Sequence, residues 1–139
     1  MRRVLAPAGW GTMSYKILVV DDSKLARMAV AKALNVLRPE WERLEATNAD
    51  EALALVQGAH VDIALVDFNM PGRDGLSLAS DLRTIRPGMP VAVVSANVQR
   101  EVMARARDAG AEFLSKPLTE TALGAFLDDA AKRLTAGAG

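Results

Sequence analysis

Short aliphatic runs separated by longer amphipathic stretches dominate the pattern of hydrophobic and polar positions along this chain. Four such runs lie at residues 17–20, 61–66, 91–94 and, shorter, 112–115, and their apolar residues follow one another rather than alternate with polar ones. Continuous apolar runs of this length are typical of parallel strands that helices cover on both faces. A weaker, edge-like strand is predicted at residues 43–46.

Apolar residues at helical spacing predict a helix after each strand. The five predicted helices lie at residues 24–37, 49–57, 75–84, 98–109 and 119–134. Stop signals lie just past four of them, at Pro39, Gly58, Pro87 and Gly110. Asn48 with Glu51 three residues later reads as a capping box for the second helix. Five successive β-α units with right-handed crossovers predict an α/β fold with a doubly wound, five-stranded parallel sheet and five helices.

Two helices carry apolar sets whose role the pattern leaves open. In the first helix the apolar positions at helical spacing are Leu25, Met28, Ala29, Ala33, Val36 and Leu37. Core packing explains them, but Leu25 and Met28 also suit a contact with a partner protein near the functional edge. In the last helix Leu123, Leu127, Ala130 and Leu134 form one core stripe. Phe126 beside that stripe is either core or a partner contact.

The composition limits the protein to one domain and excludes several function classes. With 139 residues, we expect a flexible extension at 1–14, one domain at 15–135 and a short disordered tail at 136–139. Seventeen basic and seventeen acidic residues cancel, so no net field attracts nucleic acid or a membrane surface. The absence of Cys fits a reducing compartment, and we expect a cytoplasmic protein.

Polar residues follow the predicted strands at their carboxyl ends, which is where doubly wound sheets gather function. The first strand is followed by Asp21 and Asp22, and the next strong one by Asp67. Ser95 and Lys116 follow the last two strands. The sequence therefore predicts that three carboxylates, a hydroxyl and an ammonium meet in one crevice.

Three carboxylates at one edge repel each other unless a cation joins them. Oxygen ligands without His or Cys favour a hard ion such as Mg²⁺, and the backbone carbonyl of Asn69 is a candidate further ligand. Lys116 and the Ser95 hydroxyl suit the oxygens of a phosphoryl group. Asp67 is then a candidate nucleophile that carries the phosphoryl group. Taken alone, Asp67 suits a structural turn about as well as catalysis.

Four motifs together resemble the receiver domains of two-component response regulators, especially the small chemotaxis regulators. They are VVDDS at 19–23, LVDFNMPGRDG at 65–75, VVSAN at 93–97 and FLSKPL at 113–118. The resemblance covers about residues 15–134 and implies a flavodoxin-like fold of the receiver type. It implies a phosphoprotein of phosphorelay signal transduction.

The resemblance assigns a role to each residue of the predicted crevice. Asp67 would accept phosphate from a histidine kinase or a histidine phosphotransfer protein. Asp21 and Asp22, with Asp67 and the Asn69 carbonyl, would hold Mg²⁺, while Ser95 and Lys116 would bind the phosphoryl oxygens.

The resemblance also implies a switch and a cis peptide bond. Phosphorylation would draw Ser95 toward the phosphoryl group and let Phe113 turn inward. Partner binding would then change on the face made by the fourth helix, the fifth strand and the fifth helix. A cis bond between Lys116 and Pro117 would aim the lysine at the site.

The sequence is compatible with several functions. The first is a stand-alone receiver without enzymatic activity beyond its own phosphorylation and dephosphorylation, acting on an unknown partner as a monomer or a phosphorylation-dependent dimer. The second is a phosphorelay carrier or phosphate sink. A haloacid dehalogenase-like phosphohydrolase would need an acid where Asn69 stands. A nucleotide-binding enzyme would need glycines where Asp21 and Asp22 follow the first strand.

Two other polar residues receive structural interpretations. Asp74, which precedes Gly75, is typical of a turn that opens a helix. His60, the one histidine, is predicted to be a solvated loop residue.

Overall fold

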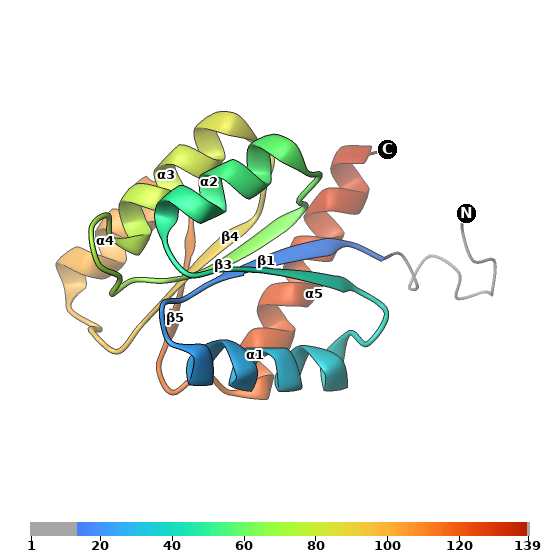
Figure 1. Ribbon diagram of the computed structural model, residues 1–139, viewed down its shortest axis with the longest axis horizontal. Coiled ribbons are helices and arrows are strands. Elements are labelled where there is room, and N and C mark those ends of the chain that lie inside the picture. The colour runs from blue at the N-terminus through green and yellow to red at the C-terminus, as the bar shows by residue number, and fades with distance from the viewer. Residues whose placement is uncertain (1–13, 139) are drawn as a thin grey trace.

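The computed structural model describes residues 14–138, which form one parallel sheet between two layers of helices (Figure 1). The strands are β1 (Lys16–Val20), β2 (Glu42–Ala46), β3 (Ile63–Asp67), β4 (Val91–Ser95) and β5 (Glu112–Ser115). Their order in the sheet is β2-β1-β3-β4-β5, and every neighbouring pair is parallel. The predicted doubly wound fold is confirmed, with β2 at one edge.

The helices divide between the two faces of the sheet. They are α1 (Lys24–Leu37), α2 (Ala49–Gly58), α3 (Gly75–Ile85), α4 (Arg100–Asp108) and α5 (Glu120–Ala138). Figure 1 shows α2, α3 and α4 on one face, and α1 and α5 on the other. Central strands β3 and β4 are buried at every position because both of their faces are covered, which explains why they are apolar up to their last residues, Asp67 and Ser95.

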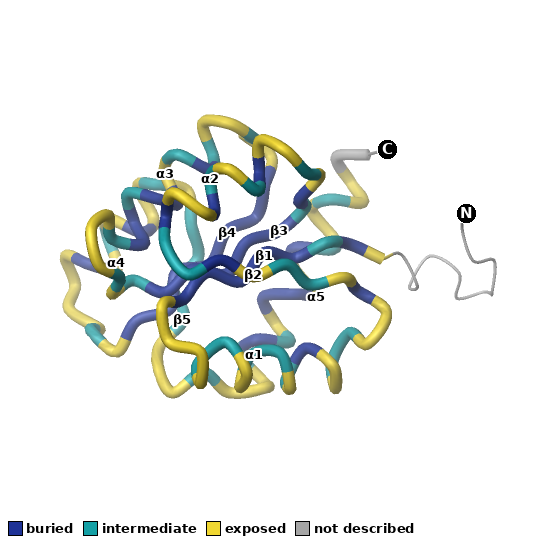
Figure 2. Tube along the Cα trace, viewed as in Figure 1, coloured by how far each residue is buried: buried dark blue, intermediate teal, exposed yellow. Residues whose placement is uncertain are grey.

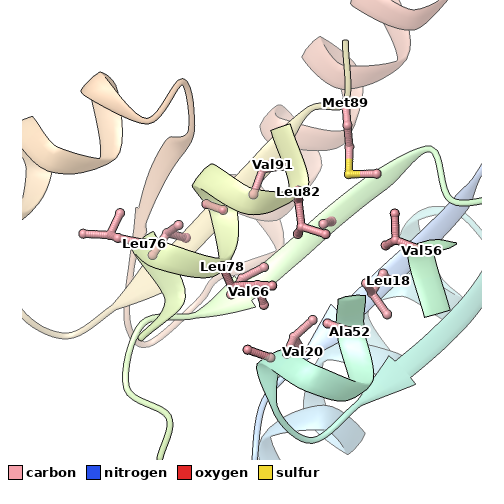
Figure 3. Close-up of a cluster of buried hydrophobic side chains, with 14 of the residues drawn as sticks. Leu18, Val20, Ala52, Val56, Val66, Leu76, Leu78, Leu82, Met89 and Val91 are labelled. Carbon is pink, nitrogen blue, oxygen red and sulfur yellow. The ribbon is translucent and has the colours of Figure 1, made fainter. Parts of the chain in front are cut away.

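Each face of the sheet has its own hydrophobic cluster. Figure 3 shows the cluster beneath α2 and α3, where side chains of the strands interlock with those of the two helices. The second cluster lies under α1 and α5, and α5 contributes Leu123, Phe126, Leu127 and Ala130 to its buried residues. Phe126 is therefore part of the core, and its alternative role as a partner contact is wrong.

The first helix presents a different face to the sheet from the one that its apolar pattern suggested. Leu25, Met28 and Val36 are exposed by 77%, 56% and 62%. Leu34 is its one buried residue, and Val30 packs partly against the same cluster. The core explanation for Leu25 and Met28 is therefore wrong. Two apolar sets at helical spacing overlap in this helix. The sheet buries the one that contains Leu34, and Ala33 and Leu37 of the predicted set pack partly beside it.

Several predicted boundaries shift by one to four residues, among them the start of β3 and the end of α5. β3 begins at Ile63. The preceding Asp62 still contacts β1, since its backbone N donates to Lys16 O at 2.9 Å and its Oδ2 accepts from Lys16 N at 2.9 Å. α5 runs to Ala138, so residues 136–138 of the predicted tail are helical. A run of Ala and Thr with one Gly costs a helix little once its preceding turns are packed. The predicted extension, apart from Ser14, lies outside the described residues.

The second helix begins with a variant of the predicted capping box. Asn48 Oδ1 accepts a hydrogen bond from Glu51 N at 2.9 Å. Glu51 Oε1 accepts from Thr47 N at 2.7 Å, one residue before the position that a capping box uses. The predicted helix start is correct. Between residues 14 and 138, no helix is both long and apolar enough to span a bilayer.

Candidate functional site

The strand order brings the predicted polar residues to one edge of the sheet. β3 lies between β1 and β4, so Asp67 lies between the strand that precedes Asp21 and the strand that ends in Ser95. β5 pairs with β4 in a register that places Ser95 opposite Ser115. Lys116 follows at once, and its backbone N donates to Ser95 O at 3.0 Å. The hydroxyl and the ammonium are thereby fixed on neighbouring strands.

Three carboxylates form the centre of this edge. Asp21, Asp22 and Asp67 each offer one oxygen, and these oxygens all lie within 4.8 Å of one another. Asp21 and Asp67 are buried, while Asp22 is exposed. Such a group of hard oxygen ligands, open to solvent on one side, fits a divalent cation that keeps part of its water shell.

Asp67 is held by Lys116 in a way that leaves its charge only partly balanced. Lys116 Nζ lies 2.7 Å from Asp67 Oδ1, while Asp67 is only 5% exposed. Among the described residues, the ammonium of Lys116 is the one group that contacts the buried Oδ1 as an ion-pair partner, and no other donor reaches this oxygen. Burial raises the pKa of Asp67, the contact with Lys116 opposes that rise, and the charge of Asp21 adds to it. A cation at this position would balance the negative charge of the three carboxylates that one lysine leaves uncompensated.

Ser95 ends β4, the strand next to the one that carries Asp67. It is 1% exposed, and its Oγ accepts a hydrogen bond from Asn97 N at 2.9 Å. The hydroxyl proton remains available for donation, because the oxygen acts as the acceptor in this contact. The Lys116–Pro117 peptide bond is cis, as the resemblance implied.

The loop after Asp67 is held close to the strand end by a glycine. Gly75 N donates to Phe68 O at 2.9 Å, and a Cβ on Gly75 would lie 2.3 Å from Asp67 O. Only glycine allows this approach. Asp74 caps α3 by accepting from Ser77 N at 2.9 Å, so its structural interpretation is confirmed.

The remaining predicted site residues have positions that agree with their expected roles but do not test them. Asn69 is exposed in the loop after β3. Phe113 on β5 is half-buried and packs against the cluster under α2 and α3. Metal coordination by the Asn69 carbonyl and rotation of Phe113 stay predictions.

Arg27 is a site residue that the sequence did not reveal. Its NH1 donates to the backbone oxygen of Asp21 at 2.6 Å, and its Nε donates to Glu45 Oε1 at 3.0 Å. Arg27 thus ties α1 and β2 to the end of β1 and fixes the backbone of Asp21. Its position six residues after Asp21 could have indicated a contact with the end of β1. An arginine in the first turn of a helix is, however, common on a solvated face, so the position alone does not predict this contact.

His60 lies far from this edge, in the loop before β3. It is exposed, as predicted, but its Nε2 lies 2.6 Å from Asp62 Oδ1 and its Nδ1 lies 3.3 Å from Arg86 NH1. It takes no part in the candidate site.

Comparison with known proteins matches this geometry to one family. Residues 17–128 match the model of the response regulator receiver domain. The glycerol metabolism activator of Pseudomonas putida is 39% identical over 105 residues, which are 73% of this chain and 47% of that protein. The chain therefore spans about half the length of this curated relative.

Solved structures agree on the fold. Chemotaxis protein CheY4 of Vibrio cholerae superposes with a TM-score of 0.77 and 27% identity, covering 85% of this chain and 99% of that one. A CheY-like receiver domain protein of Methanospirillum hungatei gives a TM-score of 0.80 at 24% identity, covering 88% and 98%. The second likeness, at this identity, bears on the fold alone.

Proposed function

Because the chain belongs to the response regulator receiver domains of two-component systems, we propose that Asp67 is its phosphoacceptor. The observation that carries this proposal is the environment of Asp67. It is a buried carboxylate with a raised pKa, and its Oδ1 has a lysine ammonium at 2.7 Å, at the edge where two further carboxylates gather. Such a combination of burial and specific charge partners is typical of a functional acid.

The proposed reaction is transfer from a phosphohistidine of a histidine kinase or a phosphotransfer protein. An oxygen of Asp67 attacks the phosphorus, the P–N bond breaks, and the imidazole leaves with its electron pair and takes up a proton. The product is an acyl phosphate on Asp67. Lys116 Nζ balances charge on the phosphoryl oxygens, and Ser95 Oγ donates a hydrogen bond to one of them.

Receiver domains bind Mg²⁺ in general, and the residues at this edge fit that ion. We assign its ligands to Asp21, Asp22, Asp67 and the Asn69 carbonyl, where Mg²⁺ would neutralise charge on the phosphoryl group in transfer. Asp21 is pre-oriented for this role, since its Oδ1 accepts from Ser23 N at 2.9 Å and Arg27 holds its carbonyl.

The output of the proposed modification is altered binding of a partner protein. Ser95 would move toward the phosphoryl group, and Phe113, which is half-buried one strand away, would turn inward. The surface of α4, β5 and α5 would thereby change its affinity for a partner. Nothing in this scheme requires nucleic acid or a membrane, and we expect it to operate in the cytoplasm as a stand-alone switch.

The test is mass spectrometry after incubation with Mg²⁺ and acetyl phosphate. The wild type should gain one phosphoryl group, and the gain should be lost in EDTA and in Asp67→Asn. Asp74→Asn is the matched control, because Asp74 is a nearby acid that caps α3, and it should be phosphorylated like the wild type. Equal labelling of Asp67→Asn would refute the assignment of the phosphoacceptor.

A further inference from the structure

A mainly apolar cavity of about 310 Å³ lies between α1 and the sheet and reaches the candidate site. The strands β1, β3 and β4 contribute Val19, Leu65 and Val94 to its walls, and Leu123 of α5 closes one side. The cavity is about twice the size of an apolar cavity of about 150 Å³ that admits benzene. It is therefore large enough for a small ring compound.

The cavity exists because α1 presents small side chains to the sheet. Ala26, Ala29, Val30 and Ala33 line it from the helix, and their short side chains leave space beside the strands, although Val30 and Ala33 also pack partly against the cluster on this face. α5 on the same face buries four apolar residues, whereas α1 buries only Leu34. Figure 2 shows the difference, with α1 largely yellow and teal beside the dark blue strands.

Water is a poor occupant for most of this space. Ordered water needs two to four polar partners, and the aliphatic walls offer none. Polar side-chain atoms line the cavity at the candidate site, from Asp21, Asp67 and Lys116, and at Thr119 on the neighbouring loop. An apolar molecule that displaces poorly held water from the rest of the cavity gains affinity.

The charges at the polar edge select among ligands. Asp21 and Asp67 carry two carboxylates there, and the one ammonium, that of Lys116, already lies against Asp67 at 2.7 Å. An anion would meet net repulsion and no free cation, so fatty acids and aromatic acids are disfavoured. The cavity suits an uncharged compound.

We propose that this cavity is a binding site for a small, uncharged apolar molecule of about the size of one aromatic ring. Such binding goes beyond the proposed function and needs no phosphoryl transfer. A ligand here would touch the strand that carries Asp67 and the loop that follows Lys116.

The probe for the test is toluene, titrated into the full chain while the methyl resonances of Val30, Leu65 and Leu123 are followed by NMR. We expect saturable shifts of these methyl groups with a dissociation constant of about 0.1–1 mM, as for other small ligands of this size. Absence of saturation, or shifts spread evenly over the protein, would overturn the proposal. Phosphorylation is measured separately, so failure of one proposal is distinguishable from failure of the other.

Two variants of α1 and one anionic compound sharpen the test. Ala33→Leu fills the cavity and should weaken toluene binding about tenfold or more. Ala31→Leu on the same helix does not line the cavity and should leave binding within about twofold, with folding of both variants checked by circular dichroism. Benzoate should not shift the three methyl groups. Equal toluene binding by the two variants, or benzoate binding as tight as that of toluene, would contradict the assignment.

Discussion

Replacement of Asp67 by Asn should stabilise the metal-free protein, although it removes an ion pair. The carboxylate of Asp67 is buried close to that of Asp21, and burial is the main reason why its pKa is raised. A raised pKa in an acid means that the fold disfavours the ionised form. Asn keeps the size of the side chain and removes the charge.

The size of the stability change for Asp67→Asn depends on repulsion from Asp21, attraction to Lys116 and the cost of desolvating the carboxylate. The carboxylate oxygens of Asp67 and Asp21 lie within 4.8 Å of each other, and at an effective dielectric constant of about 20 they repel by at least about 3.5 kcal/mol. The contact with Lys116 at 2.7 Å gives about 6 kcal/mol by the same rule, but the lysine is 38% exposed and water weakens this attraction. Desolvation of the carboxylate then decides the sign, and we expect a net gain of about 1–3 kcal/mol for Asp67→Asn at pH 7.

The dependence on pH has a defined direction. The reference pKa of the carboxyl is 3.8, and the folded-state value is higher. Below pH 3.8 Asp67 is protonated in both the folded and the unfolded state, so its charge costs the wild type nothing. As the pH rises from there through the folded-state pKa, the unfolded state ionises first and the wild type loses stability relative to Asp67→Asn. The difference should therefore grow with pH and then level off.

The assay is urea unfolding in EDTA, followed by fluorescence of Trp41, which is buried. Lys116→Met tests the balance of charges. It should lower the free energy of unfolding of the wild type by about 1–3 kcal/mol, but that of Asp67→Asn by less than about 0.5 kcal/mol. Mg²⁺ at ten times its dissociation constant should raise the free energy of unfolding of the wild type by about 1.4 kcal/mol and that of Asp67→Asn by less. If Asp67→Asn is no more stable than the wild type in EDTA at pH 7, the attraction to Lys116 outweighs desolvation and the reasoning fails.

The remaining predictions concern the loop that supports the site. Asp74→Ala should lose about 1 kcal/mol at pH 7, because Asp74 caps α3 through Ser77 N. Partial burial raises the pKa of Asp74, but this hydrogen bond and a neighbouring arginine outweigh burial and lower it below 3.8. The stabilisation is thus complete above pH 3.8 and fades below it, so a constant loss in unfolding experiments between pH 7 and pH 2 would contradict this prediction. Gly75→Ala should cost about 3 kcal/mol, since its Cβ would lie 2.3 Å from a backbone oxygen. Both glycine variants are compared with the wild type by thermal unfolding. Gly58→Ala, whose Cβ meets nothing within 4 Å, should leave the stability unchanged or raise it. Equal losses of stability in Gly75→Ala and Gly58→Ala would refute the steric argument.

The fold could be predicted because each strand has its own local apolar pattern. The grouping of the site residues at one edge could be predicted because each of them directly follows or ends a strand. The continuous apolar runs identified β1, β3 and β4, and the rule for strand ends placed Asp67 and Ser95 at one edge. The face of α1 was not predictable, because the set with Leu25 and the set with Leu34 are both apolar at helical spacing. Only the shape of the sheet beneath the helix decides between them.

The contacts around Asp67 were beyond prediction for a different reason. Whether Lys116 balances Asp67 depends on a distance between two side chains 49 positions apart in sequence, and on how much water reaches them. Arg27 illustrates the same limit, since its role depends on a hydrogen bond to a backbone oxygen rather than on a sequence motif.

The instability that we expect at Asp67 and the affinity for a cation have one physical origin. Asp21 and Asp67 are brought together by the order of the strands, which the cores on both faces enforce, so the fold itself holds their charges in repulsion. A cation removes this repulsion when it binds. The repulsion therefore lowers the free energy of unfolding of the metal-free protein and raises the affinity for the cation by the same amount. A variant that relaxes the site, such as Asp67→Asn, must therefore gain stability and lose metal affinity together. Stability and metal affinity that changed independently in a series of variants at these carboxylates would separate the two effects.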